Sequence, residues 1–241
     1  MDAGYAARYA DLYRRHWWWR AREAYLLREL ARHLEPGSAG QVLDFGCGDG
    51  LFLPLLARYG EPYGIEPDVA LLDPAGPWRS RISTEPITHV GSEAGRYGLI
   101  VALDVLEHLP DPVVAMRELA LRLRPGGIFV ATVPAFQSLW TAHDDVNHHH
   151  RRYRRQEIEA LVRGSGLTVL RSRYFFVWLA VLKWIVVRKE RLFGAKPEPA
   201  AVPWAPVNAI AHALARAEQA VIGDAEPPFG SSVIVVARAP A

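Results

Sequence analysis

The chain has 241 residues, of which 50% are hydrophobic and 22% are charged. This composition excludes intrinsic disorder and predicts one large domain with a sizeable core. Lys and Arg total 28 against 26 Asp and Glu, so the net charge is only +2, and no nucleic-acid partner is expected. The single cysteine, Cys47, excludes an internal disulfide framework. Since no secretory signal or apolar run of about 20 residues is visible, we expect a cytoplasmic protein without a transmembrane segment.

Aromatic residues near the N-terminus recur at the spacing of a helix. Tyr5, Tyr9, Tyr13 and Trp17 lie four residues apart, and the apolar pattern predicts a helix within residues 1–35. The tryptophan triplet that begins in this stripe carries more aromatic surface than one helix face can bury. We therefore expect the segment to act as a helical lid over a binding site.

The middle of the chain alternates short apolar runs with helical stretches. Strands are predicted over residues 41–45, 63–65, 87–90, 99–102, 128–132, 168–173 and 232–237. Helices are predicted over residues 51–59, 112–123 and 156–163. Strands that alternate with helices of about 10–15 residues are typical of an α/β domain with a mostly parallel sheet.

The tail departs from this alternation. An apolar helix is predicted over residues 174–192, an irregular linker over 195–206 and an Ala-rich helix over 208–222. The apolar helix favours a core or dimer element over a membrane contact, and a homodimer is left open. The chain is thus predicted to be a single domain with four parts, namely a lid (1–35), a cofactor-binding core (36–173), a helical insertion (174–222) and a final strand segment (223–241).

A glycine-rich loop follows the first predicted strand. Gly46, Gly48 and Gly50 lie between that strand and the next helix, where a sharp turn and close approach of a ligand require residues without Cβ atoms. Glu66 comes twenty residues after Gly46, at the end of the second strand. A carboxylate at this place accepts hydrogen bonds from the ribose hydroxyls of a nucleoside. The pattern predicts a nucleoside-containing cofactor.

The glycine spacing discriminates between cofactors. In the dinucleotide fingerprint G-x-G-x-x-G the third glycine falls one position later than Gly50 does here. Asp44 lies in the strand just before the loop, where a carboxylate opposes a pyrophosphate but suits a ligand with an ammonium group. An NAD-dependent oxidoreductase therefore stays an alternative, as does a catalytically inactive cofactor-binding partner.

The stretch from Asp44 to Gly50 resembles the first motif of class I S-adenosylmethionine-dependent methyltransferases, and residues 97–109 and 123–130 resemble later motifs of that family. The resemblance implies a Rossmann-like, seven-stranded, mostly parallel sheet with helices on both faces, whose last strand runs antiparallel between the fifth and sixth. It also implies S-adenosyl-L-methionine as the cofactor. The cofactor-binding residues that it assigns are Asp44, Gly46, Cys47, Gly48, Glu66, Asp104 beside the methyl donor, and Trp18 of the lid helix. For Asp104 a turn or N-cap role is an equal alternative.

A polar cluster follows the fifth strand, with four histidines, two aspartates and four arginines in residues 143–155. A solvated loop and an acid/base site are competing interpretations. We expect no metal, because neighbouring histidines on an extended chain point to opposite faces. For catalysis we favour His143 and His148 as candidate bases, with Asp144 as orienting partner. His108 is assigned to local packing. The expected substrate-binding residues are Phe136, Trp140, His150, Arg151 and Tyr153.

Together these features predict transfer of the sulfonium methyl group to a small-molecule acceptor. The expected acceptor is a hydroxyl or amine of a sugar or natural-product intermediate, since the sequence also resembles methyltransferases of bacterial polysaccharide and natural-product pathways.

Overall fold

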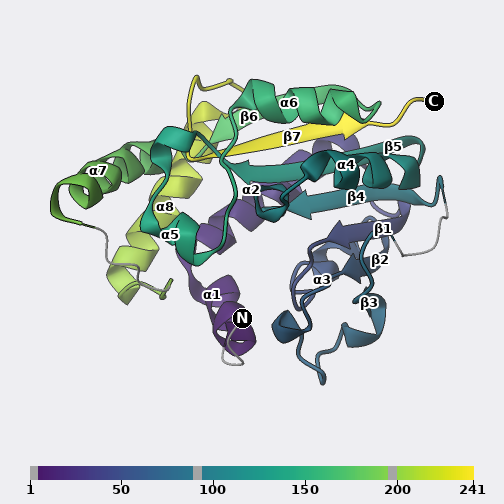
Figure 1. Cartoon of the computed structure of the whole chain (residues 1–241), viewed down its shortest axis with the longest axis horizontal. Coiled ribbons are helices and arrows are strands. Elements are labelled where there is room, and N and C mark those ends of the chain that lie inside the picture. Colours follow the sequence, from purple (N-terminus) through teal and green to yellow (C-terminus); the bar gives the residue numbers. More distant parts are fainter. Residues whose placement is uncertain (1–4, 89–93, 195–199) are drawn as a thin grey trace.

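The computed structural model describes residues 5–88, 94–194 and 200–241, whose seven strands form one sheet (Figure 1). The strands are β1 (Gly40–Phe45), β2 (Gly60–Ile65), β3 (Ile82–Ser83), β4 (Tyr97–Leu103), β5 (Leu123–Pro134), β6 (Thr168–Phe175) and β7 (Ser232–Arg238). Their order across the sheet is β3-β2-β1-β4-β5-β7-β6. Strands β1 to β5 pair in parallel, whereas β7 pairs antiparallel with both β5 and β6. The predicted Rossmann-like arrangement is confirmed.

Helices cover both faces of the sheet, as predicted (Figure 1). The helices against one face are α4 (Pro112–Arg122) and α6 (Arg155–Gly164), and those against the other are α2 (Trp17–His33), α3 (Leu53–Leu56) and α8 (Ala205–Ile222). Successive residues of β4 alternate between the two cores, with Ile100 facing α4 and α6 and Val101 facing α2. Because both faces are covered, the central strands are continuous apolar runs.

The third strand differs from the prediction. It is Ile82–Ser83, which pairs with Gly64 and Ile65 of β2. Ile87 and Thr88 form a turn, and residues 89–93 lie outside the described chain. A two-residue edge strand is too short to produce an alternating pattern, so the longer apolar run downstream was the wrong choice.

The predicted N-terminal helix is two helices, α1 (Tyr5–Arg15) and α2. His16 breaks it: its backbone is extended, and its ring Nδ1 accepts a hydrogen bond from the N–H of Trp18. The α2 half of the expected lid belongs to the core. Its inward side chains, all at most 8% exposed, are those of Trp17, Ala21, Arg22, Tyr25, Leu26, Glu29 and Leu30.

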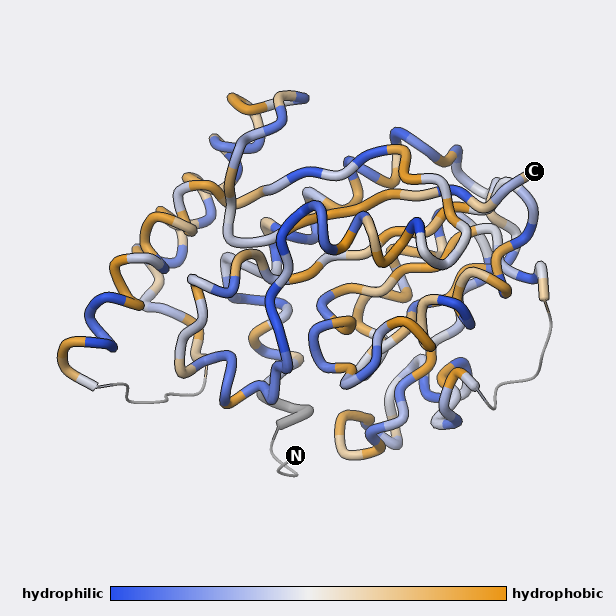
Figure 2. The backbone as a smooth tube through the Cα atoms, turned by 45° about the horizontal axis from the view of Figure 1, so that its top comes forward, coloured by the Kyte–Doolittle hydropathy of each residue, from blue (hydrophilic) through white to orange (hydrophobic). Residues whose placement is uncertain are grey.

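The insertion consists of α7 (Val177–Phe193) and α8, of which α8 begins at Ala205, three residues before the predicted start. Helix α7 projects from one side of the molecule (Figures 1 and 2), and its apolar residues Trp184, Leu192 and Phe193 are exposed. None of the described helices is both long and apolar enough to span a membrane. The predicted linker is irregular from residue 200 to 204, and residues 195–199 lie outside the described chain.

Candidate active site

The glycine loop lies at the carboxyl end of β1. Gly46 and Gly48 have φ values of +73° and +53°, in the left-handed region that favours glycine. A Cβ on Gly46 would lie 2.5 Å from Cγ2 of Val105, which belongs to the segment after β4. Only a residue without a side chain therefore allows the loop to approach the end of β4. The backbone that results is a cradle of the kind that nucleoside cofactors occupy in parallel sheets.

Glu66 lies against this loop, directly after β2. Its Oε2 accepts a hydrogen bond of 3.0 Å from the N–H of Gly48, and its Oε1 accepts one of 3.0 Å from the N–H of Asp68. Burial raises the pKa of Glu66, while these two hydrogen bonds oppose the rise. The side chain is thereby fixed in direction, and each oxygen keeps a lone pair for a ligand hydroxyl.

Two further carboxylates, those of Asp104 and Asp44, lie beside the loop, and the charge of Arg22 in α2 acts on both. Asp104 has a φ of +57°, forms an ion pair with Arg22 and donates its backbone N–H to the carbonyl of Thr132. The Arg22 guanidinium also donates to the Thr132 hydroxyl at 3.2 Å. Asp44 is 3% exposed, and burial raises its pKa to about 7 even though Arg22 lowers it. The site thus places a buried carboxylate, Asp44, and a half-buried one, Asp104, near the buried cation of Arg22.

Cys47 and Trp18 were also predicted to contact the cofactor. The Cys47 thiol is half-buried in the loop, and burial raises its pKa. Its Sγ occupies the space beside Gly64, where a Cβ would lie 2.4 Å away. Trp18 packs on Phe176, and the Arg22 guanidinium lies 5.3 Å from its ring centroid. Trp18 therefore connects to the site through Arg22.

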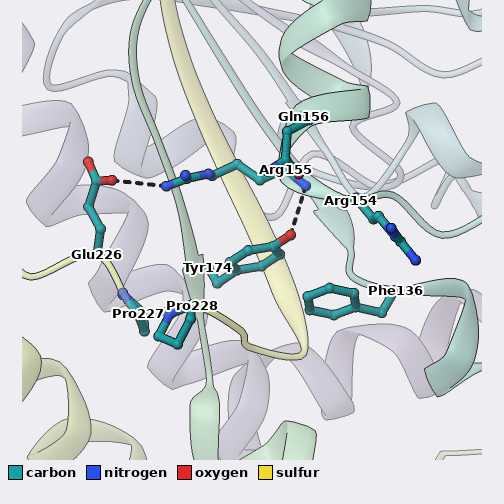
Figure 3. Close-up of a pocket in the computed structure, with 8 residues that line it drawn as sticks. All are labelled: Phe136, Arg154, Arg155, Gln156, Tyr174, Glu226, Pro227 and Pro228. Carbon is teal, nitrogen blue, oxygen red and sulfur yellow. Dashed lines mark hydrogen bonds and ion pairs between the residues drawn. The ribbon is translucent and has the colours of Figure 1, made fainter.

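Two pockets where an acceptor could bind lie beside Phe136, two residues after the end of β5. Phe136 stacks on Tyr174 with ring centroids 4.8 Å apart, and it lines two pockets. One, of about 480 Å³, is edged by the ion pair of Arg155 and Glu226 (Figure 3). The other, of about 350 Å³, lies under α7 and is mostly apolar. Its lining residues are Phe136, Ser138, Leu139, Ala180, Val181, Trp184 and Phe229.

Asp144 is engaged in a buried network within the histidine-rich segment. It lies in α5 (Ala142–Val146), is fully buried, and accepts hydrogen bonds from Nε and Nη2 of Arg152 at 2.8 and 2.9 Å. It also accepts one of 2.8 Å from Nδ1 of His149 and one of 2.9 Å from the N–H of Thr141. Asp144 was expected to orient His143 or His148, but it is paired with His149, which was not among the predicted site residues.

The other predicted residues of this region divide into exposed and anchored side chains. His143, His148 and His150 are exposed. Tyr153 is 6% exposed, and its hydroxyl donates to the carbonyl of Leu106. The remaining two anchors are Arg151, which donates to the carbonyls of Leu109 and Pro110, and Trp140, whose Nε1 donates to Asp145. The side-chain hydrogen bonds of Arg151 and Tyr153 thus go to backbone carbonyls of the segment after β4.

Sequence reasoning missed Arg22, Glu107 and His149. Arg22 falls on the inner face of a helix whose apolar pattern suggested only packing. Glu107 and His149 are far apart in sequence, and their segments are brought together by hydrogen bonds such as the one from the N–H of His150 to the carbonyl of Glu107. A charged residue at a core position of an amphipathic helix was the one available signal, and it applies to Arg22 alone.

The strand order, with an antiparallel β7 between β5 and β6, and the glycine loop after β1 define the class I fold of S-adenosylmethionine-dependent methyltransferases. A family model described as a methyltransferase domain matches residues 18–172, well over half of the chain. The chain belongs to this family of methyltransferases, and S-adenosyl-L-methionine is the cofactor that the family indicates. The cradle that a Cβ at Gly46 would fill, together with the fixed carboxylate of Glu66, fits that cofactor.

Comparison with individual proteins agrees with this assignment. The ubiquinone biosynthesis O-methyltransferase of Albidiferax ferrireducens is 29% identical over 152 residues, which are 55% of this chain and 59% of that protein. The chain spans about half the length of the first curated relatives it matches.

Solved structures share the fold at low sequence identity. A putative methyltransferase in complex with the Haloferax volcanii Trm112 methyltransferase activator has a TM-score of 0.59 and 19% identity, with 98% of this chain and 95% of that chain covered. The Haemonchus contortus phosphoethanolamine N-methyltransferase 2, in complex with S-adenosyl-L-methionine, has a TM-score of 0.57 and 14% identity, with 90% and 53% covered. These likenesses concern the fold alone.

Proposed function

We propose that this protein transfers the methyl group of S-adenosyl-L-methionine to a hydroxyl oxygen of a small molecule with an apolar part. The observation that carries the proposal is the mostly apolar pocket of about 350 Å³ under α7, at the carboxyl end of β5. Its volume falls in the range of small-molecule sites. The glycine loop of β1 lies at the same edge of the sheet, because the carboxyl ends of parallel strands meet there.

An oxygen acceptor is favoured by the curated relatives, which are named O-methyltransferases. The apolar lining favours an acceptor with a ring or a hydrocarbon portion over a bare sugar, since few polar groups face the pocket. The proposed class of acceptor is therefore narrower than the class expected from the sequence, which included sugars. Transfer to an amine remains the second candidate, because a free amine needs no base.

The chain's own residues would bind and orient both partners. Glu66 would hold the ribose, and Asp44 would attract the ammonium group of the methionine portion. When bound, the cofactor supplies an electrophilic methyl group. Phe136 and α7 would hold the acceptor in line with it and exclude water, and such positioning provides much of the rate in displacement reactions. The candidate bases for an acceptor hydroxyl are His143 and His148, which are exposed and belong to the segment between β5 and α6.

Calorimetry with S-adenosylhomocysteine, the stable product, tests the cofactor half of the proposal. We expect micromolar affinity and much weaker binding of NAD. Glu66→Ala should weaken binding of the product by about 1.5–3 kcal/mol, the scale of hydrogen bonds to a charged group. Glu61→Ala is the matched control, because Glu61 lies on the same strand but pairs with Arg81 at the surface. Tight binding of NAD without binding of the adenosyl ligand would contradict the methyltransferase assignment.

The acceptor half is tested by release of S-adenosylhomocysteine with matched pairs of acceptors. The pairs have the same apolar ring and carry either a hydroxyl or an amine. Higher turnover of hydroxyl compounds supports the proposal. Turnover of amines alone would overturn the oxygen assignment and leave the methyltransferase assignment intact.

A further inference from the structure

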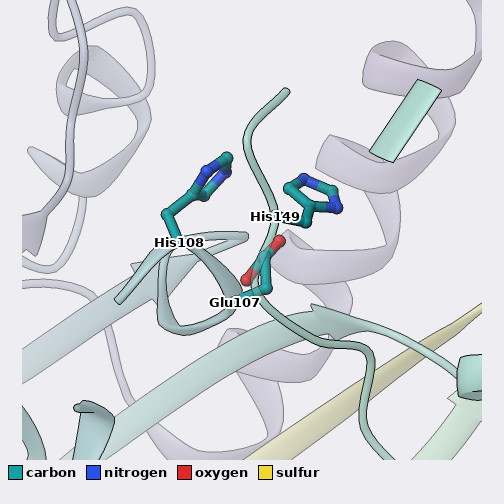
Figure 4. A group of neighbouring side chains, drawn as sticks. All are labelled: Glu107, His108 and His149. Carbon is teal, nitrogen blue, oxygen red and sulfur yellow. The ribbon is translucent and has the colours of Figure 1, made fainter. Parts of the chain in front are cut away.

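Three side chains with metal-binding atoms meet beside the carboxyl end of β4. Glu107 and His108 belong to the short helix η3 (Leu106–His108), and His149 comes from the histidine-rich segment (Figure 4). One ligand atom from each lies within 4.8 Å of the other two. Tetrahedral ligands that are each about 2.0–2.2 Å from one ion lie about 3.3–3.6 Å apart, so side-chain movements of about 1 Å close the site.

Glu107 has no partner that would explain its burial. Its side chain is fully buried, and neither carboxylate oxygen has a hydrogen-bond partner among the described residues. Burying an unpaired carboxylate is costly, and buried charges are normally paired or bound to metals. A cation held between Glu107 and the two imidazoles would supply the missing interaction.

Both histidines are oriented by second interactions. Nδ1 of His149 donates a hydrogen bond of 2.8 Å to Asp144, which leaves Nε2 of His149 as the atom that can bind a metal ion. Asp144 is itself fixed by its ion pair with Arg152. The backbone of Asn147 lies within hydrogen-bonding reach of the His108 ring. A carboxylate or carbonyl behind each ligating histidine is the usual support of a metal site, since it fixes tautomer and ring direction.

We propose that Glu107, His108 and His149 bind one divalent first-row transition-metal ion. Two imidazoles and one carboxylate suit Zn²⁺ or Mn²⁺, whereas Mg²⁺ and Ca²⁺ prefer oxygen ligands throughout. His108 is exposed, so an ion has a path from solvent. Three protein ligands leave positions for water or for an oxygen of a small molecule. No metal was expected from the sequence because consecutive histidines point to opposite faces, but here a single one of them, His149, meets two residues of η3.

A role for the ion in holding the acceptor oxygen rests on the proposed function, whereas ion binding itself does not. The site lies next to Asp104, the first residue after β4. An acceptor hydroxyl bound to the ion would be placed at the cofactor edge of the sheet. The competing explanation is that Glu107 is a protonated carboxyl with no ion.

Titration calorimetry on the whole chain, treated with a chelator and dialysed, tests the proposal with ZnCl₂ and MnCl₂ as probes. We expect one ion per chain at micromolar affinity or tighter. Glu107→Gln and His108→Ala should each weaken binding at least tenfold, whereas His150→Ala, in the same histidine run but outside the cluster, should not change it. Binding of S-adenosylhomocysteine to each variant shows that the fold is intact and reports separately on the proposed function.

Two results would overturn the metal site. One is the absence of ion binding below millimolar concentration in the wild-type chain. The other is ion binding that Glu107→Gln and His108→Ala leave unchanged while His150→Ala abolishes it, which would assign the ion to the exposed histidines. A Co²⁺ absorption spectrum of a four- or five-coordinate ion that Glu107→Gln removes would support the site independently.

Discussion

Replacing Asp144 by Asn should destabilise the fold strongly. The substitution keeps the volume of the side chain but removes the charge that balances Arg152, which is itself only 4% exposed. Asn also presents one oxygen where the carboxylate presents two to Arg152 and His149. Removal of one partner from a buried ion pair costs about 3–5 kcal/mol. For a domain of this size, each kcal/mol lowers Tm by about 2–4 °C, which gives a fall of about 6–20 °C.

Urea unfolding at pH 7, followed by tryptophan fluorescence, measures this loss. Asp145→Asn is the matched control, because the neighbouring Asp145 is exposed and accepts one hydrogen bond, from Trp140. Its unfolding free energy should stay within about 0.5 kcal/mol of the wild type. Equal stability of the two variants would refute the structural role assigned to Asp144.

The buried ion pair of Asp144 and Arg152 also predicts how the stability of the fold depends on pH. Burial alone would raise the pKa of Asp144, but the hydrogen bond from His149 and the charge of Arg152 outweigh it and hold the pKa well below its usual range. A depressed pKa stabilises the folded state above the unfolded value of about 3.9, and this contribution disappears as the pH falls through the folded value. The stability difference between wild type and Asp144→Asn should therefore narrow below about pH 4. A constant difference from pH 7 to pH 3 would contradict the assigned pairing.

Three further outcomes are expected. Because the pKa of Asp44 is raised to about 7, the ionised fraction of this carboxyl decreases at lower pH. Calorimetry should therefore show that S-adenosylhomocysteine binds about fivefold more weakly at pH 6 than at pH 7, and Asp44→Asn should remove this pH dependence. Trp17→Ala should lower the free energy of unfolding by about 3–5 kcal/mol in urea, whereas the exposed Trp204→Ala should change it little. If His143 or His148 is the base, its substitution by Ala should reduce turnover by about 10²–10⁴ with product binding unchanged, and near wild-type rates would exclude both.

The sequence predicted those parts of the fold that leave a local pattern. Long buried strands such as β4 are continuous apolar runs, and the helix after Asp111 has an N-cap and Pro112 in its first turn. The break at His16 left no such pattern, because the fourfold aromatic spacing continues across it. The edge strand β3 was missed because two residues carry no periodicity.

The candidate site was predictable where its residues follow strands that are consecutive in the sequence. The glycine loop and Glu66 follow from spacing along two consecutive strands. The pairing of His149 with Asp144, and the approach of Glu107 to His149, depend on how the histidine-rich segment returns to β5 through the bridge between Ala135 and Tyr153. Such contacts between distant segments are fixed by tertiary packing, which no local spacing reveals.

The hydrogen bonds between α2 and the insertion limit how the enzyme can be re-engineered or diversify. Asn208 accepts from the N–H of Trp17 and donates to the carbonyl of Arg15, while Gln219 donates to the carbonyl of Ala21 and accepts from Arg28 through its own carbonyl. A chimera that imports only α7 and α8 from another methyltransferase would remove these partners of the end of α1 and of α2. Exchange of the insertion in this scaffold therefore requires that two segments almost two hundred residues apart be transplanted together.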